Sequence, residues 1–130
     1  MIMELIYLVL GLVYLMLPAY VANMAPVFAR GHFQFLNKPL NFGLTFRKKR
    51  VLGDNKTFRG LLVGVSLGTL VGIGQGLLPL ALFPSVIMNS TWQWAFLISL
   101  GALLGDAVKS FFKRQCGVAP GTPWVPFDQI

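Results

Sequence analysis

The sequence predicts an all-α protein of the membrane: a polytopic bundle of three transmembrane helices with one long loop between the first two. Three observations predict this class. Of the 130 residues, 55% are hydrophobic and only 12% are charged, whereas about 25% of a soluble domain is charged. The mean hydropathy is +0.69. Three stretches are long and apolar enough to cross a hydrocarbon core ~30 Å thick, which takes about 20 residues.

The first predicted span covers residues 4–29 and contains Pro18 and Pro26 with Asn23 between them. Because each proline removes a backbone donor, we expect an interrupted helix whose freed carbonyls find partners inside the protein or in a wet cavity. Asn23 has two open interpretations, a hydrogen bond between helices or a donor that lines a pocket. No basic region precedes the apolar run, so we expect it to be retained rather than removed as a signal peptide.

The second and third predicted spans cover residues 58–78 and 92–112. The second has a glycine at every fourth position, namely Gly60, Gly64, Gly68, Gly72 and Gly76. Such a ladder lets another helix backbone approach closely, so we expect these glycines to serve packing. The third span begins with Trp92 and Trp94, which suit a membrane interface.

Charge is distributed unevenly along a chain of net charge +7. Basic residues gather in the connection 30–57 and after the third span, whereas residues 79–91 carry no charge. The positive-inside rule therefore predicts a cytoplasmic loop 30–57, a cytoplasmic active site and an N-terminus outside. The basic run 47–50 is explained by anionic lipid. Lipid or a phosphorylated substrate suits so apolar a chain better than nucleic acid does, and the oligomeric state stays open.

A stripe of polar side chains shares one face of the third span: Asp106, Lys109, Ser110 and Lys113. A charge near the bilayer centre costs about 2.5–3.5 kcal/mol, so the stripe must face partners, water or a ligand. Snorkelling at the helix end explains Lys113 and Arg114 but not Asp106, which lies about 9 Å deeper than Phe112. An Asp106–Lys109 ion pair is one explanation. We favour the other, a metal-binding aspartate beside phosphate-binding cations.

A second polar cluster, residues 53–60, precedes and begins the second span with the sequence Gly-Asp-Asn-Lys-Thr-Phe-Arg-Gly. Asp54 and Asn55 suit the cap of a helix whose amino terminus favours an anion. Lys56, Thr57 and Arg59 would add phosphate donors. The cluster is no Walker A loop, because arginine and asparagine stand where that motif requires glycine.

A third cluster, residues 120–130, is rich in proline and contains Asp128. Together with Asp106, this aspartate could hold a hard divalent cation, since Mg²⁺ prefers carboxylate oxygens combined with substrate phosphates. The alternative, a solvated aspartate in a loop, remains open.

These clusters resemble the signature of a known family. Gly-Asp-x-x-x-Ser-x-x-Lys-Arg over residues 105–114, followed by Pro-Phe-Asp-Gln over residues 126–129, resembles the cytidylyltransferase signature of CDP-diglyceride synthases. Residues 53–60, together with Pro-Ala-Tyr-Val-Ala-Asn-Met-Ala-Pro-Val over residues 18–27, resemble the archaeal branch, the CDP-archaeol synthases. The resemblance covers most of the chain.

The resemblance implies a membrane enzyme of archaeal phospholipid synthesis. Such enzymes condense CTP with the ether lipid 2,3-bis-O-geranylgeranylglycerol 1-phosphate, forming a CDP-activated lipid and pyrophosphate, and they require Mg²⁺. It implies metal binding by Asp106 and Asp128, and a catalytic centre of Asp106, Lys113 and Asp128. The implied phosphate-binding residues are Lys56, Arg59, Lys109, Ser110, Lys113 and Arg114. Asp54, Asn55 and Asn23 would orient the nucleotide or its phosphates.

The sequence departs from the family pattern Asp-x-x-Asp, because it stops at Ile130 before the second aspartate. The family would also continue into about two more membrane helices. We therefore expect residues 1–130 to form one transmembrane catalytic domain that is incomplete at its carboxyl end and inactive unless complemented. Two rival functions remain, a CTP-dependent polyprenol kinase and a small non-enzymatic transporter or assembly subunit.

Overall fold

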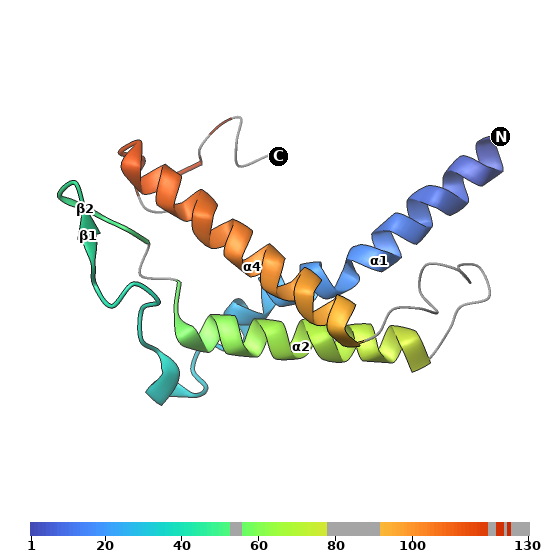
Figure 1. The fold of residues 1–130 in the computed structure, drawn as a ribbon, viewed down its shortest axis with the longest axis horizontal. Helices are drawn as coiled ribbons and strands as arrows, with labels where there is room; N and C mark the ends of the chain where they lie inside the picture. Colours follow the sequence, from blue (N-terminus) through green and yellow to red (C-terminus); the bar gives the residue numbers. More distant parts are fainter. Residues whose placement is uncertain (53–55, 78–91, 120–121, 124, 126–130) are drawn as a thin grey trace.

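The computed structural model describes residues 1–52, 56–77, 92–119, 122–123 and 125. Its long elements are the helices α1 (Ile2–Phe28), α2 (Phe58–Leu77) and α4 (Trp92–Gln115). The connection between α1 and α2 contains the 3-10 turn η1 (Gln34–Leu36) and the antiparallel strands β1 (Thr45–Phe46) and β2 (Lys49–Arg50). All three long helices are apolar enough to cross a membrane, which confirms the predicted class. Figure 1 shows α1 and α4 crossing each other, with the first turns of α4 lying on α2.

The predicted interruption of the first span is wrong, because α1 runs through Pro18 and Pro26 as one helix. Proline at position 18 leaves the Tyr14 carbonyl without its usual donor four residues on, and the Nε2 group of Gln75 in α2 donates to that oxygen instead. At Pro18, α2 therefore supplies a hydrogen bond in place of the one that the proline removes. This confirms for Tyr14 the expected partner within the protein.

The centre of the bundle is built from small residues. Four glycines of α2 are buried, namely Gly60, Gly64, Gly68 and Gly72. A methyl group on Gly64 would lie 2.7 Å from the Ala22 carbonyl oxygen, and one on Gly68 would lie 2.7 Å from the Pro18 oxygen. The ladder therefore serves close packing as predicted, except that Gly76 is exposed.

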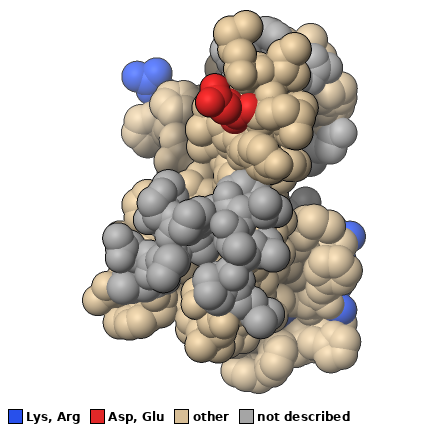
Figure 2. Space-filling model, turned by 90° about the vertical axis from the view of Figure 1, so that its right-hand side faces the viewer, with Lys and Arg blue, Asp and Glu red and all other residues tan. Residues whose placement is uncertain are grey.

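The helices of the bundle share two ends. At the basic end, which is the left of Figure 1, α1 and α4 finish, α2 begins and the hairpin β1–β2 lies. At the opposite end, the first turns of α1 stand clear of the other helices (Figure 1). Figure 2 shows this opposite end, where basic side chains appear only at the rim of the described surface. Charge thus concentrates where the connection 30–57 lies, as the sequence predicts.

That connection folds back against the helices. An isolated bridge pairs Pro39 with Thr57, and the Phe58 amide donates to the Lys38 carbonyl at 3.0 Å. The hairpin itself was not predicted. Its turn residues Arg47 and Lys48 have φ of 50° and 62°, a region that residues other than glycine seldom occupy.

Candidate active site

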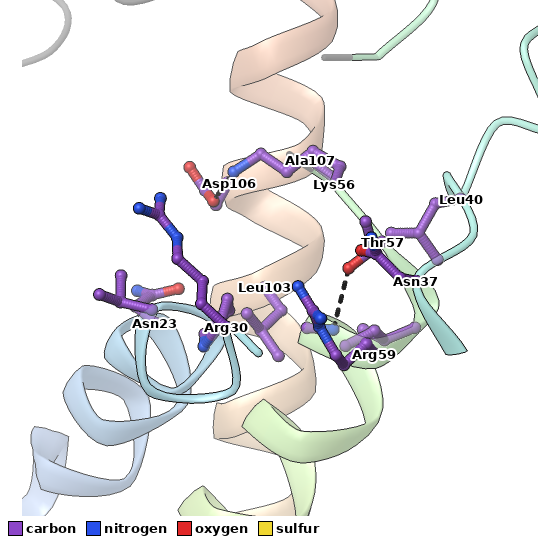
Figure 3. Close-up of a pocket in the computed structure, with 14 residues that line it drawn as sticks. Asn23, Arg30, Asn37, Leu40, Lys56, Thr57, Arg59, Leu103, Asp106 and Ala107 are labelled. Atoms are coloured by element: carbon purple, nitrogen blue, oxygen red, sulfur yellow. Dashed lines mark hydrogen bonds and ion pairs between the residues drawn. The ribbon is translucent and has the colours of Figure 1, made fainter. Parts of the chain in front are cut away.

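A cavity of about 460 Å³ lies at the basic end, where α1, α2 and α4 meet. Small-molecule sites typically enclose about 300–1,000 Å³. The cavity is lined from four parts of the chain: the last turns of α1, the connection near Asn37, the segment 56–61, and the α4 residues Leu103, Asp106 and Ala107. Segments far apart in sequence therefore line one cavity at the basic end of the helix bundle (Figure 3).

Close packing of α1 on α2 positions one wall of the cavity. Pro26 of α1 packs on Gly60, where an added methyl group would lie 3.2 Å from the proline ring. This contact brings Asn23 in the last turns of α1, and Arg30 in the turn that follows, beside the start of α2. The glycine at position 60 thus lets α1 and α2 share the cavity wall.

The start of α2 is fixed by Thr57, whose Oγ1 accepts a hydrogen bond from the Gly60 amide at 3.2 Å. This is the standard N-cap arrangement, in which a side-chain oxygen satisfies a free amide of the first turn. We had expected Asp54 or Asn55 to cap this helix. They lie outside the described residues, and because α2 begins at Phe58 the capping position is Thr57.

Asp106 of α4 forms an ion pair with Lys56, which lies just before α2. The side chain of Asp106 is 47% exposed and that of Lys56 is 25% exposed. Arg30 extends from the turn after α1 toward the same space (Figure 3). Asp106 therefore faces cations from other segments. The sequence offered Lys109 as one explanation for its ion-pair partner, and the structure pairs it with Lys56.

Arg59 also lines the cavity and is only 9% exposed. Its Nη1 donates to the His32 carbonyl at 3.2 Å. Within the described residues no carboxylate pairs with this guanidinium, which has five N–H donors. Since a buried charge without a counter-ion is costly, this arginine favours an anion in the cavity.

The structure brings four predicted site residues to one cavity: Asn23, Lys56, Arg59 and Asp106. Four others follow Asp106 along α4 but do not line the cavity: Lys109, Ser110, Lys113 and Arg114. Arg114 donates to the Val118 carbonyl at 3.5 Å, near the end of the helix. Asp54, Asn55 and Asp128 lie outside the described residues, so their roles stay predictions.

The cavity also contains Thr57, which the sequence predicts as a phosphate donor, and two residues that the sequence did not assign to the site, Arg30 and Asn37. The capping role of Thr57 could have been predicted as well, because threonine directly before a predicted helix is a preferred N-cap. Asn37 lies in a turn signal within the connection, and its place depends on how that connection folds. In the described part of the chain no three His, Cys, Asp or Glu side chains gather at a metal-binding distance.

Comparison with known proteins decides the family. The model of the CarS-like family, CDP-archaeol synthase, matches residues 2–130. The chain belongs to the CDP-archaeol synthase family. This confirms the resemblance recognised in the three sequence clusters.

Curated members of the CDP-archaeol synthase family cover most of the chain. The CDP-archaeol synthase of Pyrococcus furiosus is 42% identical over 114 residues, which are 87% of this chain and 64% of that protein. The CDP-archaeol synthase of Thermofilum pendens is 47% identical over 117 residues, which are 88% of this chain and 53% of that protein. The chain therefore spans less than two thirds of the length of these relatives.

A solved structure has the same fold. It is that of an intramembrane enzyme for archaeal membrane lipids biosynthesis, and it is 36% identical to this chain. It superposes with a TM-score of 0.72 over 90% of this chain and 67% of the other. The protein is thus a multi-pass membrane protein with the fold of its family.

Proposed function

We propose that this protein is a membrane cytidylyltransferase that joins CTP to a prenylated glycerol-phosphate lipid and releases pyrophosphate, forming CDP-archaeol. The observation that carries the proposal is the cavity that Arg30, Lys56, Arg59 and Asp106 line together, with Lys56 paired to the Asp106 carboxylate. The names of its relatives support the reaction. The positive-inside rule supports a cavity that faces the cytoplasm, with the N-terminus outside.

The charge balance of the cavity favours a polyanion. Its described lining holds three basic side chains and one acidic side chain. Guanidinium groups bind phosphate oxygens through two parallel hydrogen bonds, and Arg59 has donors to spare beyond the His32 carbonyl. A triphosphate would neutralise the buried charge of Arg59, for which the described residues supply no carboxylate.

The cavity also suits Mg²⁺. This ion is commonly held in nucleotide sites by one or two carboxylates together with substrate phosphates, and Asp106 is a partly exposed carboxylate at the cavity wall. We propose Asp106 as a ligand, joined by Asp128 as the sequence predicts. When bound, the ion would neutralise phosphate charge. Lys56 holds the Asp106 carboxylate toward the cavity.

In the proposed reaction an oxygen of the lipid phosphate attacks the α-phosphorus of CTP. A new P–O bond forms there, and the bond from that phosphorus to the oxygen bridging it to the β-phosphorus breaks, so pyrophosphate leaves. Catalysis of phosphoryl-type transfer consists mainly of positioning and charge neutralisation. In this proposal Arg59, Lys56 and Arg30, which line the cavity, would bind the triphosphate. The predicted phosphate contacts of Lys109, Ser110, Lys113 and Arg114 would lie farther along α4.

The fate of labelled CTP tests the reaction. Membranes that contain the protein in its natural form are incubated with the ether-lipid phosphate, Mg²⁺ and CTP labelled at either the α- or the γ-phosphate. We expect α-label in the lipid and γ-label in pyrophosphate. Transfer of γ-label to the lipid would instead identify a CTP-dependent lipid kinase. Absence of both lipid labelling and Mg²⁺-dependent CTP binding would favour the non-enzymatic alternative.

A further inference from the structure

The hairpin β1–β2 projects from the basic end beside the last turns of α4 (Figure 1). It stands outside the cavity, and none of its residues lines that cavity. Its turn places Arg47 and Lys48 side by side at positive φ, although asparagine and glycine are the residues that such two-residue turns favour. Two cations therefore occupy the tip of a hairpin to which the proposed reaction gives no role.

The hairpin is fastened to the point where α4 leaves its apolar span. The Lys49 Nζ donates to the Gln115 carbonyl at 2.8 Å, and the rings of Phe46 and Phe111 lie 6.3 Å apart. The guanidinium of Arg47 lies 5.5 Å from the centre of the Phe46 ring. The aromatic pair Phe111 and Phe112 is followed directly by the basic pair Lys113 and Arg114, which marks the end of the apolar span. These contacts therefore hold the hairpin at the level where lipid headgroups begin.

Apolar side chains accompany the cations on the same hairpin. Leu44, whose carbonyl accepts a hydrogen bond from the Val51 amide at 3.2 Å, is 64% exposed, and Phe46 is 50% exposed. Residues 5–53 contain no acidic residue to oppose the basic charge. A soluble anion would use only the cations, whereas an anionic bilayer surface accepts both basic and apolar side chains.

We infer that the β1–β2 hairpin is a docking element for anionic lipid headgroups of the surrounding bilayer. Arg47 and Lys48 bind the headgroup phosphates, while Leu44 and Phe46 enter the interfacial layer. Docking would hold the connection that carries Lys56 against α4. The inference does not depend on the proposed reaction, because it concerns bulk lipid and a surface separate from the cavity.

The test places a fluorescent probe on Thr45→Cys in a Cys116→Ser background and reconstitutes the protein in bilayer discs. The discs contain phosphatidylcholine, with or without phosphatidylglycerol, and a trace of headgroup spin-labelled lipid. We expect quenching of the probe to rise with phosphatidylglycerol and to fall with added NaCl. Equal quenching in neutral and anionic discs would overturn the inference, as would loss of quenching on addition of inorganic phosphate at constant ionic strength.

Two double variants test whether docking depends on the positive charge of Arg47 and Lys48. In R47Q/K48Q we expect the docking equilibrium to weaken about 30-fold, because each basic residue near an anionic surface contributes about 1 kcal/mol. The matched control R47K/K48R keeps both charges and should dock as the parent does. Equal docking by both double variants would also overturn the inference. A CTP-binding measurement on R47Q/K48Q, expected to be unchanged, reports that the cavity remains folded.

Discussion

Gln75 of α2 donates its side-chain amide to the Tyr14 carbonyl of α1, the oxygen whose usual donor is missing because residue 18 is proline. Gln75 is only 8% exposed, so the pair lies within the apolar bundle. In a membrane an unsatisfied carbonyl cannot turn to water for a partner. This one hydrogen bond therefore compensates for a proline on a different helix.

Replacing Gln75 with leucine should destabilise the protein by about 1–3 kcal/mol, the typical cost of leaving a buried acceptor without a partner. Adding Pro18→Ala should recover part of that loss, because alanine restores the amide donor within α1. Thermal unfolding in detergent of the two single variants and the double variant gives the coupling free energy. Purely additive effects of the two changes would contradict the proposed compensation.

Gly68→Ala should destabilise the bundle by about 1–3 kcal/mol, the usual range for overpacking. A methyl group there would lie 2.7 Å from the Pro18 carbonyl oxygen and would collide with the Ser99 side chain. Gly74→Ala is the matched control on the same helix, since nothing lies within 4 Å of its added methyl group. The control should be neutral or stabilising by up to about 1 kcal/mol. Equal unfolding temperatures for the two variants would show that the glycine ladder is not closely packed.

The helices could be predicted because their signals are local, whereas the connection could not. Length and hydropathy placed the start of α2 at Phe58 and the start of α4 at Trp92, as the structure has them. The hairpin depends instead on positive φ at Arg47 and Lys48, which no local preference of these residues predicts. Its position follows from long-range contacts of Lys49 and Phe46 with α4.

Asp106→Asn should abolish the Mg²⁺ dependence of CTP binding, because the amide removes the described carboxylate that lines the cavity. We expect the affinity for CTP in Mg²⁺ to fall at least about tenfold, which corresponds to ~1.4 kcal/mol. Equilibrium binding of labelled CTP, with Mg²⁺ or with a chelator, measures the effect. Glu4→Gln is the control, since this acidic residue is exposed in the first turn of α1. If the Asp106→Asn variant bound CTP with unchanged Mg²⁺ dependence, Asp106 would not be a ligand of the ion.

The residues of the candidate site could be predicted only where they lie in local motifs. Asp106 stood out because an aspartate is costly inside an apolar span, and Lys56 and Arg59 because they border a predicted helix. The cavity nevertheless depends on how the helices cross, which brings Lys56 to Asp106 and Arg30 to the same wall. The helical stripe from Asp106 to Lys113 shares a face as predicted, but the cavity reaches only the Asp106 turn.

Arg59 provides the sharpest test of an anionic ligand, because it is buried, lines the cavity and donates to a single backbone oxygen among the described groups. Arg59→Gln should weaken CTP binding by about 10- to 100-fold, since a buried charged hydrogen bond contributes about 1.5–3 kcal/mol. Arg59→Lys keeps the charge but loses the planar fork of donors, so its affinity should lie between those of the parent and the glutamine variant.

Lys38→Gln is the matched control for Arg59→Gln, because Lys38 is an exposed cation of the same connection that does not line the cavity. Binding is measured at two salt concentrations, since a general loss of positive potential is screened by salt whereas a buried contact is screened much less. An effect of Lys38→Gln as large as that of Arg59→Gln would mean that overall charge, rather than a phosphate contact of Arg59, attracts the nucleotide. A selective loss for Arg59→Gln that persists at high salt would instead locate the triphosphate beside the buried guanidinium.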